Sequence, residues 1–133
     1  MITQEERDQI RRDYDQFVDE TASRIKQEFG LADVEMHPFA VTVWVGSGIY
    51  LKIVIVRNKQ TRAFESAEIV LEPIRERTRI CIGTDNAQTA YLRLVGRLVN
   101  EPTSTRLNAM LREFCEKETQ LWNERIRLLY GGD

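Results

Sequence analysis

The chain has 133 residues, of which 42% are hydrophobic and 30% charged, and its formal net charge is -2. This length is typical of one domain with one core, so we predict a single domain over residues 1–133, and the composition excludes a disordered chain. The mild negative charge argues against strong nonspecific binding of nucleic acid by the whole chain. No apolar run approaches the ~20 residues of a membrane helix, and the charged N-terminus has no secretory apolar segment, so we expect a cytoplasmic protein without a membrane partner.

The first thirty residues predict a long helix over residues 4–29. Thr3 followed by Glu6 forms a capping box, and Gly30 is typical of a helix end. Between these signals the apolar stripe recurs at helical spacing, at Ile10, Tyr14, Phe17, Val18, Thr21, Ile25 and Phe29. Such a helix is about 39 Å long and presents one apolar face with a charged back.

From residue 31 to residue 83 the hydrophobic period changes from 3.6 to 2, which indicates strands. We expect a short strand over residues 34–36, a hairpin over residues 39–56, a polar loop over residues 57–65, and two further strands over residues 66–72 and 77–83. The strand over residues 49–56 should be interior to the sheet. The segment therefore predicts an antiparallel sheet of four to five strands.

The hairpin is the most unusual pattern in the chain. A two-residue turn at Ser47 and Gly48 would set Val45 opposite Tyr50 and Val43 opposite Lys52. In that register both faces are apolar, one with Val41, Val43, Tyr50, Val54 and Val56 and the other with Trp44, Leu51, Ile53 and Ile55. We therefore expect helices on both faces, or a partner protein on one of them.

Two helices follow the strands. Thr84 or Asp85 can cap a helix over residues 86–99, and a longer helix begins near Thr103 or Ser104 and ends at Leu129 or Tyr130. The predicted fold is therefore α+β, an antiparallel sheet of four to five strands with a long N-terminal helix and two C-terminal helices.

Two charged residues, Glu118 and Arg125, lie near the centre of the apolar arc of the last helix. In one interpretation both side chains extend past the arc or bond to a neighbouring helix. In the other they set the register of a helix pair or a two-fold dimer, with Glu118 of one copy meeting Arg125 of the second.

The sequence shows no catalytic or metal-binding pattern. His37 is the single histidine, and Cys81 and Cys115 read as separate buried thiols, so a zinc site would lack ligands. The triplet Gly46, Ser47 and Gly48 is followed by no helix and reads as a hairpin turn, not as a phosphate loop. We predict no cofactor and favour a non-enzymatic role, while an enzyme with a ligand cavity between sheet and helices stays a third hypothesis.

The function we expect is a protein-binding domain, working as a homodimer, adaptor, inhibitor or small chaperone. It would use an apolar sheet face and the long C-terminal helix, and the interface candidates are Val43, Tyr50, Val54, Val56, Glu118, Trp122 and Arg125. The alternative is a nucleic-acid-binding module that uses the basic residues between positions 57 and 79, namely Arg57, Lys59, Arg62, Arg75, Arg77 and Arg79.

Overall fold

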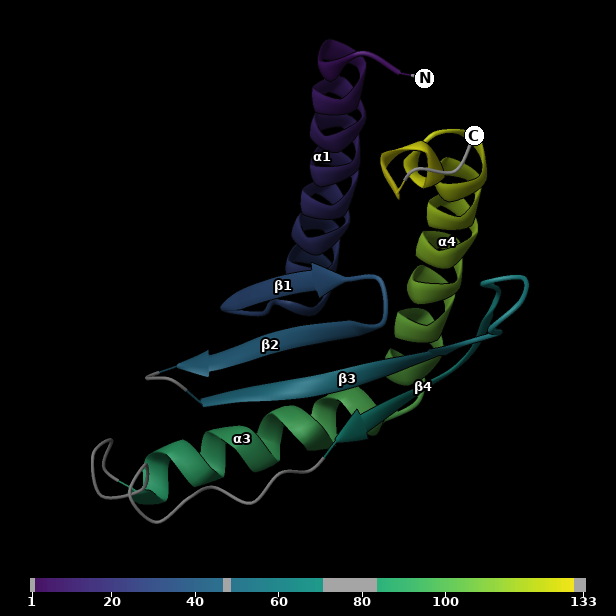
Figure 1. The fold of residues 1–133 in the computed structure, drawn as a ribbon. Coiled ribbons are helices and arrows are strands. Elements are labelled where there is room, and N and C mark those ends of the chain that lie inside the picture. The colour runs from purple at the N-terminus through teal and green to yellow at the C-terminus, as the bar shows by residue number, and fades with distance from the viewer. Residues whose placement is uncertain (1, 47–48, 71–83, 131–133) are drawn as a thin grey trace.

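The computed structural model describes residues 2–46, 49–70 and 84–130, and it has an α+β fold. In chain order its elements are α1 (Gln4–Phe29), β1 (Asp33–His37), β2 (Ala40–Gly46), β3 (Ile49–Arg57), β4 (Phe64–Val70), α3 (Thr84–Val99), α4 (Thr103–Glu124) and the 3-10 helix η1 (Ile126–Tyr130). The sheet is antiparallel, in the order β1-β2-β3-β4 (Figure 1). The predicted fold class and the interior position of β3 are confirmed, whereas the strand expected over residues 77–83, including Cys81, lies outside the described residues.

The ends of α1 are those that the capping signals predict. The Thr3 side chain accepts a hydrogen bond from the Glu6 N–H at 3.1 Å, and Gly30 takes the left-handed conformation at φ 59°. The last helix ends earlier than expected. Regular α-helix stops at Glu124, and the chain continues through Arg125 into the short η1.

The register of the β2–β3 hairpin differs from the predicted one by a single residue. Gly46 pairs with Ile49 and Trp44 pairs with Tyr50, so Val45 is an extra residue in a bulge. Because side chains alternate along a strand, this shift moves one strand's entire apolar set to the opposite face. Val43 now lies opposite Leu51 instead of Lys52.

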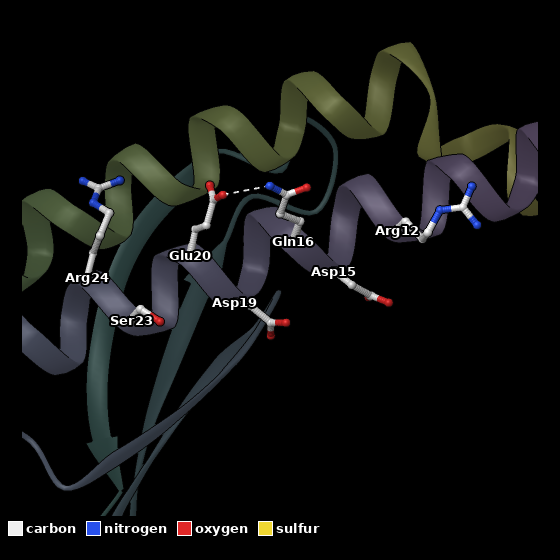
Figure 2. A pocket seen from close by; sticks show the side chains of 7 residues that line it. All are labelled: Arg12, Asp15, Gln16, Asp19, Glu20, Ser23 and Arg24. Carbon is white, nitrogen blue, oxygen red and sulfur yellow. Dashed lines mark hydrogen bonds between the residues drawn. The ribbon is translucent and has the colours of Figure 1, made fainter.

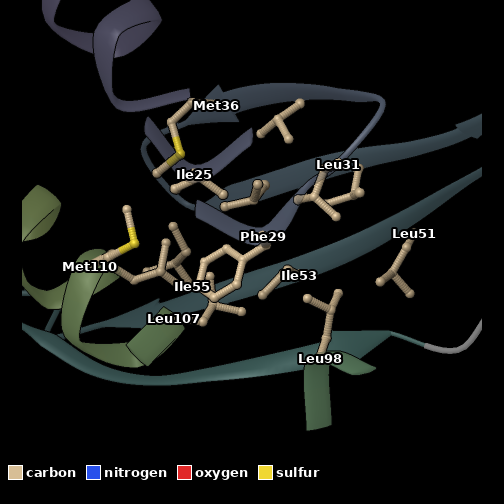
Figure 3. Close-up of a cluster of buried hydrophobic side chains, with 14 of the residues drawn as sticks. Ile25, Phe29, Leu31, Met36, Leu51, Ile53, Ile55, Leu98, Leu107 and Met110 are labelled. Carbon is tan, nitrogen blue, oxygen red and sulfur yellow. The ribbon is translucent and has the colours of Figure 1, made fainter. Parts of the chain in front are cut away.

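The hairpin is therefore not equally apolar on its two faces, and the expectation of helices on both faces is corrected. The large aliphatic side chains of three strands share one face, which we call the core face: Val34, Met36, Val41, Val43, Leu51, Ile53 and Ile55. These strand residues form one cluster with side chains from the helices. Figure 3 shows Met36, Leu51, Ile53 and Ile55 of the sheet beside Ile25 of α1, Leu98 of α3 and Met110 of α4. One sheet face thus packs against all three helices.

Helices α1 and α4 form an antiparallel pair, with the N-terminal end of α1 and the C-terminal end of α4 at the same end (Figure 1). At that end Asp13 pairs with Arg125 at 2.6 Å, and towards the sheet Glu28 pairs with Arg106 at 2.8 Å. Phe17 and Phe114 stack between the helices, with ring centroids 5.2 Å apart. This pair carries the charged cluster described next.

Candidate functional site

A buried ion cluster joins β3, the β3–β4 loop and α4. The Arg57 Nη2 donates to Glu118 Oε1 at 2.8 Å, and the Arg62 Nη2 lies 2.8 Å from both oxygens of the same carboxylate. The side chains of Arg57 and Glu118 are 0% and 1% exposed, and that of Arg62 is 19% exposed. Two guanidiniums therefore share one carboxylate, which leaves one positive charge in excess among these buried groups.

Arg57 is a structural hub of this cluster. Its Nε donates to the Arg62 carbonyl at 2.7 Å and its Nη1 to the Pro38 carbonyl at 3.1 Å, while Nη2 also reaches the hydroxyl of Thr119 at 3.0 Å. All three nitrogens of the guanidinium have acceptors, which offsets the cost of burying the charge. Arg57 thereby joins the β1–β2 turn, the β3–β4 loop and α4.

Arg62 is held in an unusual backbone conformation. Its φ is 65°, in the left-handed region that Gly or Asn adopts more cheaply. The loop around it is fixed by Asn58, whose side chain accepts hydrogen bonds from the N–H groups of Gln60 and Thr61. The Arg62 Nε is buried without a hydrogen-bond partner among the described residues.

Tyr14 of α1 completes the cluster. Its hydroxyl lies 3.2 Å from Glu118 Oε2 and donates to that carboxylate. Burial, together with the neighbouring charge of Glu118, raises the pKa of Tyr14 well above its ordinary value of 10.0. The hydroxyl therefore stays protonated and acts as a donor.

Beside this cluster lies a cavity of about 430 Å³, which we call the Trp122 cavity. Residues from five separate segments line it: Arg11, Tyr14, Asp15, Pro38, Phe39, Arg62, Glu118, Trp122, Ile126, Leu129 and Tyr130. The Arg62 guanidinium lies 4.2 Å from the centroid of the Trp122 ring, and Trp122 stacks with Tyr130 at 5.5 Å. Aromatic walls and a buried charged end thus meet in one hollow.

A larger hollow of about 690 Å³ lies along the surface of α1. Figure 2 shows that its lining side chains all come from this one helix: Arg12, Asp15, Gln16, Asp19, Glu20, Ser23 and Arg24. Gln16 donates to Glu20 one turn away at 3.1 Å, as neighbours on a solvated helix do. We read this hollow as the polar back of α1.

The sheet face opposite the core face is the second candidate surface, which we call the outer face. The strand register places on it Asp33, Glu35, Thr42, Trp44, Tyr50, Lys52, Val54, Val56, Glu68 and Val70. Trp44 and Tyr50 pack against each other with ring centroids 5.3 Å apart, and Tyr50 is 42% exposed. Lys52 lies between Tyr50 and Val54 on this face, and the three carboxylates that the described residues place there are on β1 and β4.

The structure separates the predicted interface residues into three places. Tyr50, Val54 and Val56 lie on the outer face, whereas Val43 is on the core face and 1% exposed. Trp122 and Glu118 line the cavity. The partners of the two charged residues in the last helix belong to the same chain, since Glu118 binds Arg57 and Arg62 and Arg125 binds Asp13. The first interpretation of these charges, bonding to neighbouring elements, describes the structure, and neither residue needs a second copy of the chain.

The predicted nucleic-acid residues do not form one exposed surface among the described residues. Arg57 is buried and fully bonded, Arg62 is committed to Glu118, and Lys59 is exposed in the loop between them. Arg75, Arg77 and Arg79 lie outside the described residues. Of the three cations predicted to bind phosphates from this loop, Lys59 is therefore the one that is available to do so.

Sequence reasoning missed two aromatic residues of the cavity, Tyr14 and Phe39. Tyr14 and Phe39 face Trp122 from segments more than eighty residues away along the chain, so no local spacing points to them. The predicted register, which has no bulge at Val45, puts Trp44 on the same face as Leu51 and Ile53, whereas the structure puts Trp44 on the outer face. A bulge of this kind has no residue signature in this hairpin beyond the nearby Gly46.

Over the described ranges, no group of three or more His, Cys, Asp or Glu side chains could hold a metal ion. No described helix combines the length and the apolar character needed to span a bilayer. The chain matches no protein-family model, no curated protein and no solved structure.

Proposed function

We propose that this chain is a protein-binding domain that uses the outer face of its sheet. One observation supports the proposal above the others: Trp44, Tyr50 and Val54 stand on the sheet face opposite the one that packs on the helices. Partly exposed aromatic residues with charged neighbours are typical of binding surfaces, because aromatic side chains bury much area with few rotamers to fix. The role is non-enzymatic in this proposal.

The charges of the outer face favour a different protein over a second copy of this chain. Among the described residues of this face, Asp33, Glu35 and Glu68 lie on β1 and β4, and Lys52 on β3 is the one ammonium group. Two copies meeting through this face would bring like charges together, which costs free energy, whereas a partner with an apolar patch and a basic border would be attracted. The partner we expect is therefore a protein with basic residues around an apolar contact.

A capture experiment with matched variants tests the proposal. The chain is used as bait in extract of its native cell, as wild type, as the outer-face variant Tyr50→Lys/Val54→Lys, and as the control Leu92→Lys. Leu92 is 58% exposed on α3 and offers the same change from apolar to cationic away from the sheet. We expect a partner that wild type and Leu92→Lys retain, that the outer-face variant loses, and that dissociates as salt rises.

Two results would contradict this proposal. One is a partner that binds the outer-face variant as well as it binds wild type, and the other is no partner in any of the three baits. Light scattering on the purified chain supplies the second readout. A wild-type dimer that Tyr50→Lys/Val54→Lys dissociates would show that the outer face binds a second copy of this chain and would overturn the choice of a different protein as the partner.

A further inference from the structure

We infer that the Trp122 cavity is a binding site for a small aromatic monocarboxylate. The inference is independent of the outer face, because the cavity lies between α1, α4 and the two loops and has different residues. Its volume of about 430 Å³ is in the range of cavities that hold small organic molecules.

The charged end of the cavity, formed by Arg57, Arg62 and Glu118, favours the binding of one additional negative charge. Arg57 and Arg62 share the single carboxylate of Glu118, and Tyr14 remains a neutral donor. An excess cation in a poorly solvated site is stabilised by a counter-anion. Every hydrogen bond that the Arg62 guanidinium donates to described residues leaves from Nη2, and its buried Nε has no partner among them. A ligand carboxylate at the exposed part of this side chain would therefore supply an acceptor that the described residues do not.

The rim adds further positive potential. Arg11 lines the cavity, and Arg7 donates to the carbonyl of Leu129, another lining residue, at 3.2 Å. The lining itself holds two cations, Arg11 and Arg62, and two carboxylates, Asp15 and Glu118, so the positive excess comes from Arg57 and Arg7 behind it. An approaching anion is therefore favoured over a cation.

The aromatic side chains that line the cavity indicate the chemical nature of the rest of the anion. Phe39 and Tyr130 are 52% and 74% exposed, although both line the cavity, and the Arg62 guanidinium lies 5.7 Å from the Phe39 ring centroid and 4.2 Å from that of Trp122. Such flat apolar side chains gain most from stacking on another ring. An aromatic body with one carboxylate satisfies both the walls and the charged end, whereas inorganic phosphate would satisfy the charge alone.

The backbone at Arg62 supports a role for this side chain. A non-glycine residue at φ 65° costs free energy that Gly or Asn would largely avoid. The position nevertheless carries the arginine that lies between Glu118 and Trp122. Strain at a residue that lines a cavity is typical of binding sites.

Titration of the ¹⁵N-labelled chain with 2-naphthoate tests the inference, with the indole N–H resonances of Trp122 and Trp44 as readouts. The Trp44→Phe variant assigns the two signals, and Trp44, on the outer face, serves as the internal control. We expect a saturable shift of the Trp122 signal and no shift of the Trp44 signal. The neutral 2-naphthamide should bind at least about tenfold more weakly than 2-naphthoate. Inorganic phosphate should shift neither signal saturably.

Variants separate the contribution of the arginine charges to ligand binding from that of the aromatic walls. Arg62→Gln leaves Glu118 paired with Arg57, and it should weaken 2-naphthoate about tenfold while 2-naphthamide stays nearly unchanged. Arg11→Gln, on the exposed rim, should lower the naphthoate affinity by a smaller factor, and Phe39→Ala should weaken both ligands. Arg24→Gln is the matched control, since Arg24 is exposed further along α1 and outside the cavity lining.

Any of three results would overturn the inference. The first is no saturable shift of the Trp122 signal, and the second is equal binding of naphthoate and naphthamide. The third is a naphthoate affinity that is the same in wild type, in Arg11→Gln and in Arg62→Gln. Saturable binding of phosphate with no response to naphthoate would also overturn it, because it would assign the charged end to an inorganic anion.

Discussion

Arg57 and Glu118 form an ion pair of 2.8 Å between side chains that are 0% and 1% exposed, and sixty-one residues separate them along the chain. The pair joins the end of β3 to the middle of α4. Because Arg62 and Tyr14 bind the same carboxylate, Glu118 holds four segments together: α1, β3, the β3–β4 loop and α4. This relationship fixes the position of the Trp122 cavity.

Removing this carboxylate should destabilise the fold strongly. Glu118→Gln leaves Arg57 buried without a counter-charge, so we expect the free energy of unfolding to fall by about 3–5 kcal/mol. Urea unfolding followed by circular dichroism measures the change. Glu116→Gln, an exposed change on the same helix, should stay within about 0.5 kcal/mol. Equal effects of the two substitutions would show that the cluster does not stabilise the fold.

Tyr14 should make stability sensitive to alkaline pH. Its pKa is raised in the folded state by burial and by Glu118, so the unfolded chain loses the phenol proton first, near pH 10.0. The stabilisation is therefore complete below pH 10.0 and decreases as the pH rises above it. Tyr14→Phe should lose about 1.5–3 kcal/mol at neutral pH, because a hydrogen bond to a charged group is removed.

The Tyr14 prediction is checked by thermal unfolding of wild type and Tyr14→Phe between neutral pH and pH 10.5. The difference in stability between the two proteins should shrink at the alkaline end. A constant difference across this range would contradict the assigned direction of the pKa shift.

Two valines distinguish the register with the bulge at Val45 from the register predicted from the sequence, which would place both valines on the same face. Val41 is 0% exposed on the core face, whereas Val54 is half-buried on the outer face. Val41→Thr buries a hydroxyl and should cost about 1–3 kcal/mol. Val54→Thr should cost about 0.5 kcal/mol or less.

Both threonine variants are isosteric with valine, so each is the control for the other. Urea unfolding of the two proteins gives the comparison. Similar losses of stability would support the register without the bulge and would contradict the described sheet.

The Asp13–Arg125 pair should contribute to acid sensitivity. Hydrogen bonds from Gln9 and then from Arg125 lower the pKa of Asp13 below its ordinary value of 3.8. A carboxyl group with a lowered pKa stabilises the folded state above its unfolded-state pKa, and this contribution is lost as the pH falls through the folded value. Asp13→Asn should therefore reduce the loss of stability below about pH 4.

Melting temperatures of wild type and Asp13→Asn at pH 7 and at pH 3 measure this effect. Because both partners are partly exposed, salt should weaken it. Asp19→Asn, an exposed change on the same helix, is the control. An unchanged acid slope in Asp13→Asn would contradict the prediction.

The sequence by itself determines the elements whose signals are local. Thr3, Glu6 and Gly30 set the two ends of α1 within a few residues, and the change of hydrophobic period separates the strands from the helices. These signals suffice for the α+β class and for the interior place of β3, because helix caps and strand alternation depend on near neighbours.

Only the tertiary structure decides the register of the hairpin and the partners of the buried charges. The bulge at Val45 follows from packing Val41 and Val43 with Leu51 against the helices, which is a property of the whole core. The sequence shows Glu118 as a charge in an apolar arc, but its partners come from segments 56 to 104 residues away. Contacts of this kind depend on how the elements meet in space, and no spacing along the chain encodes them.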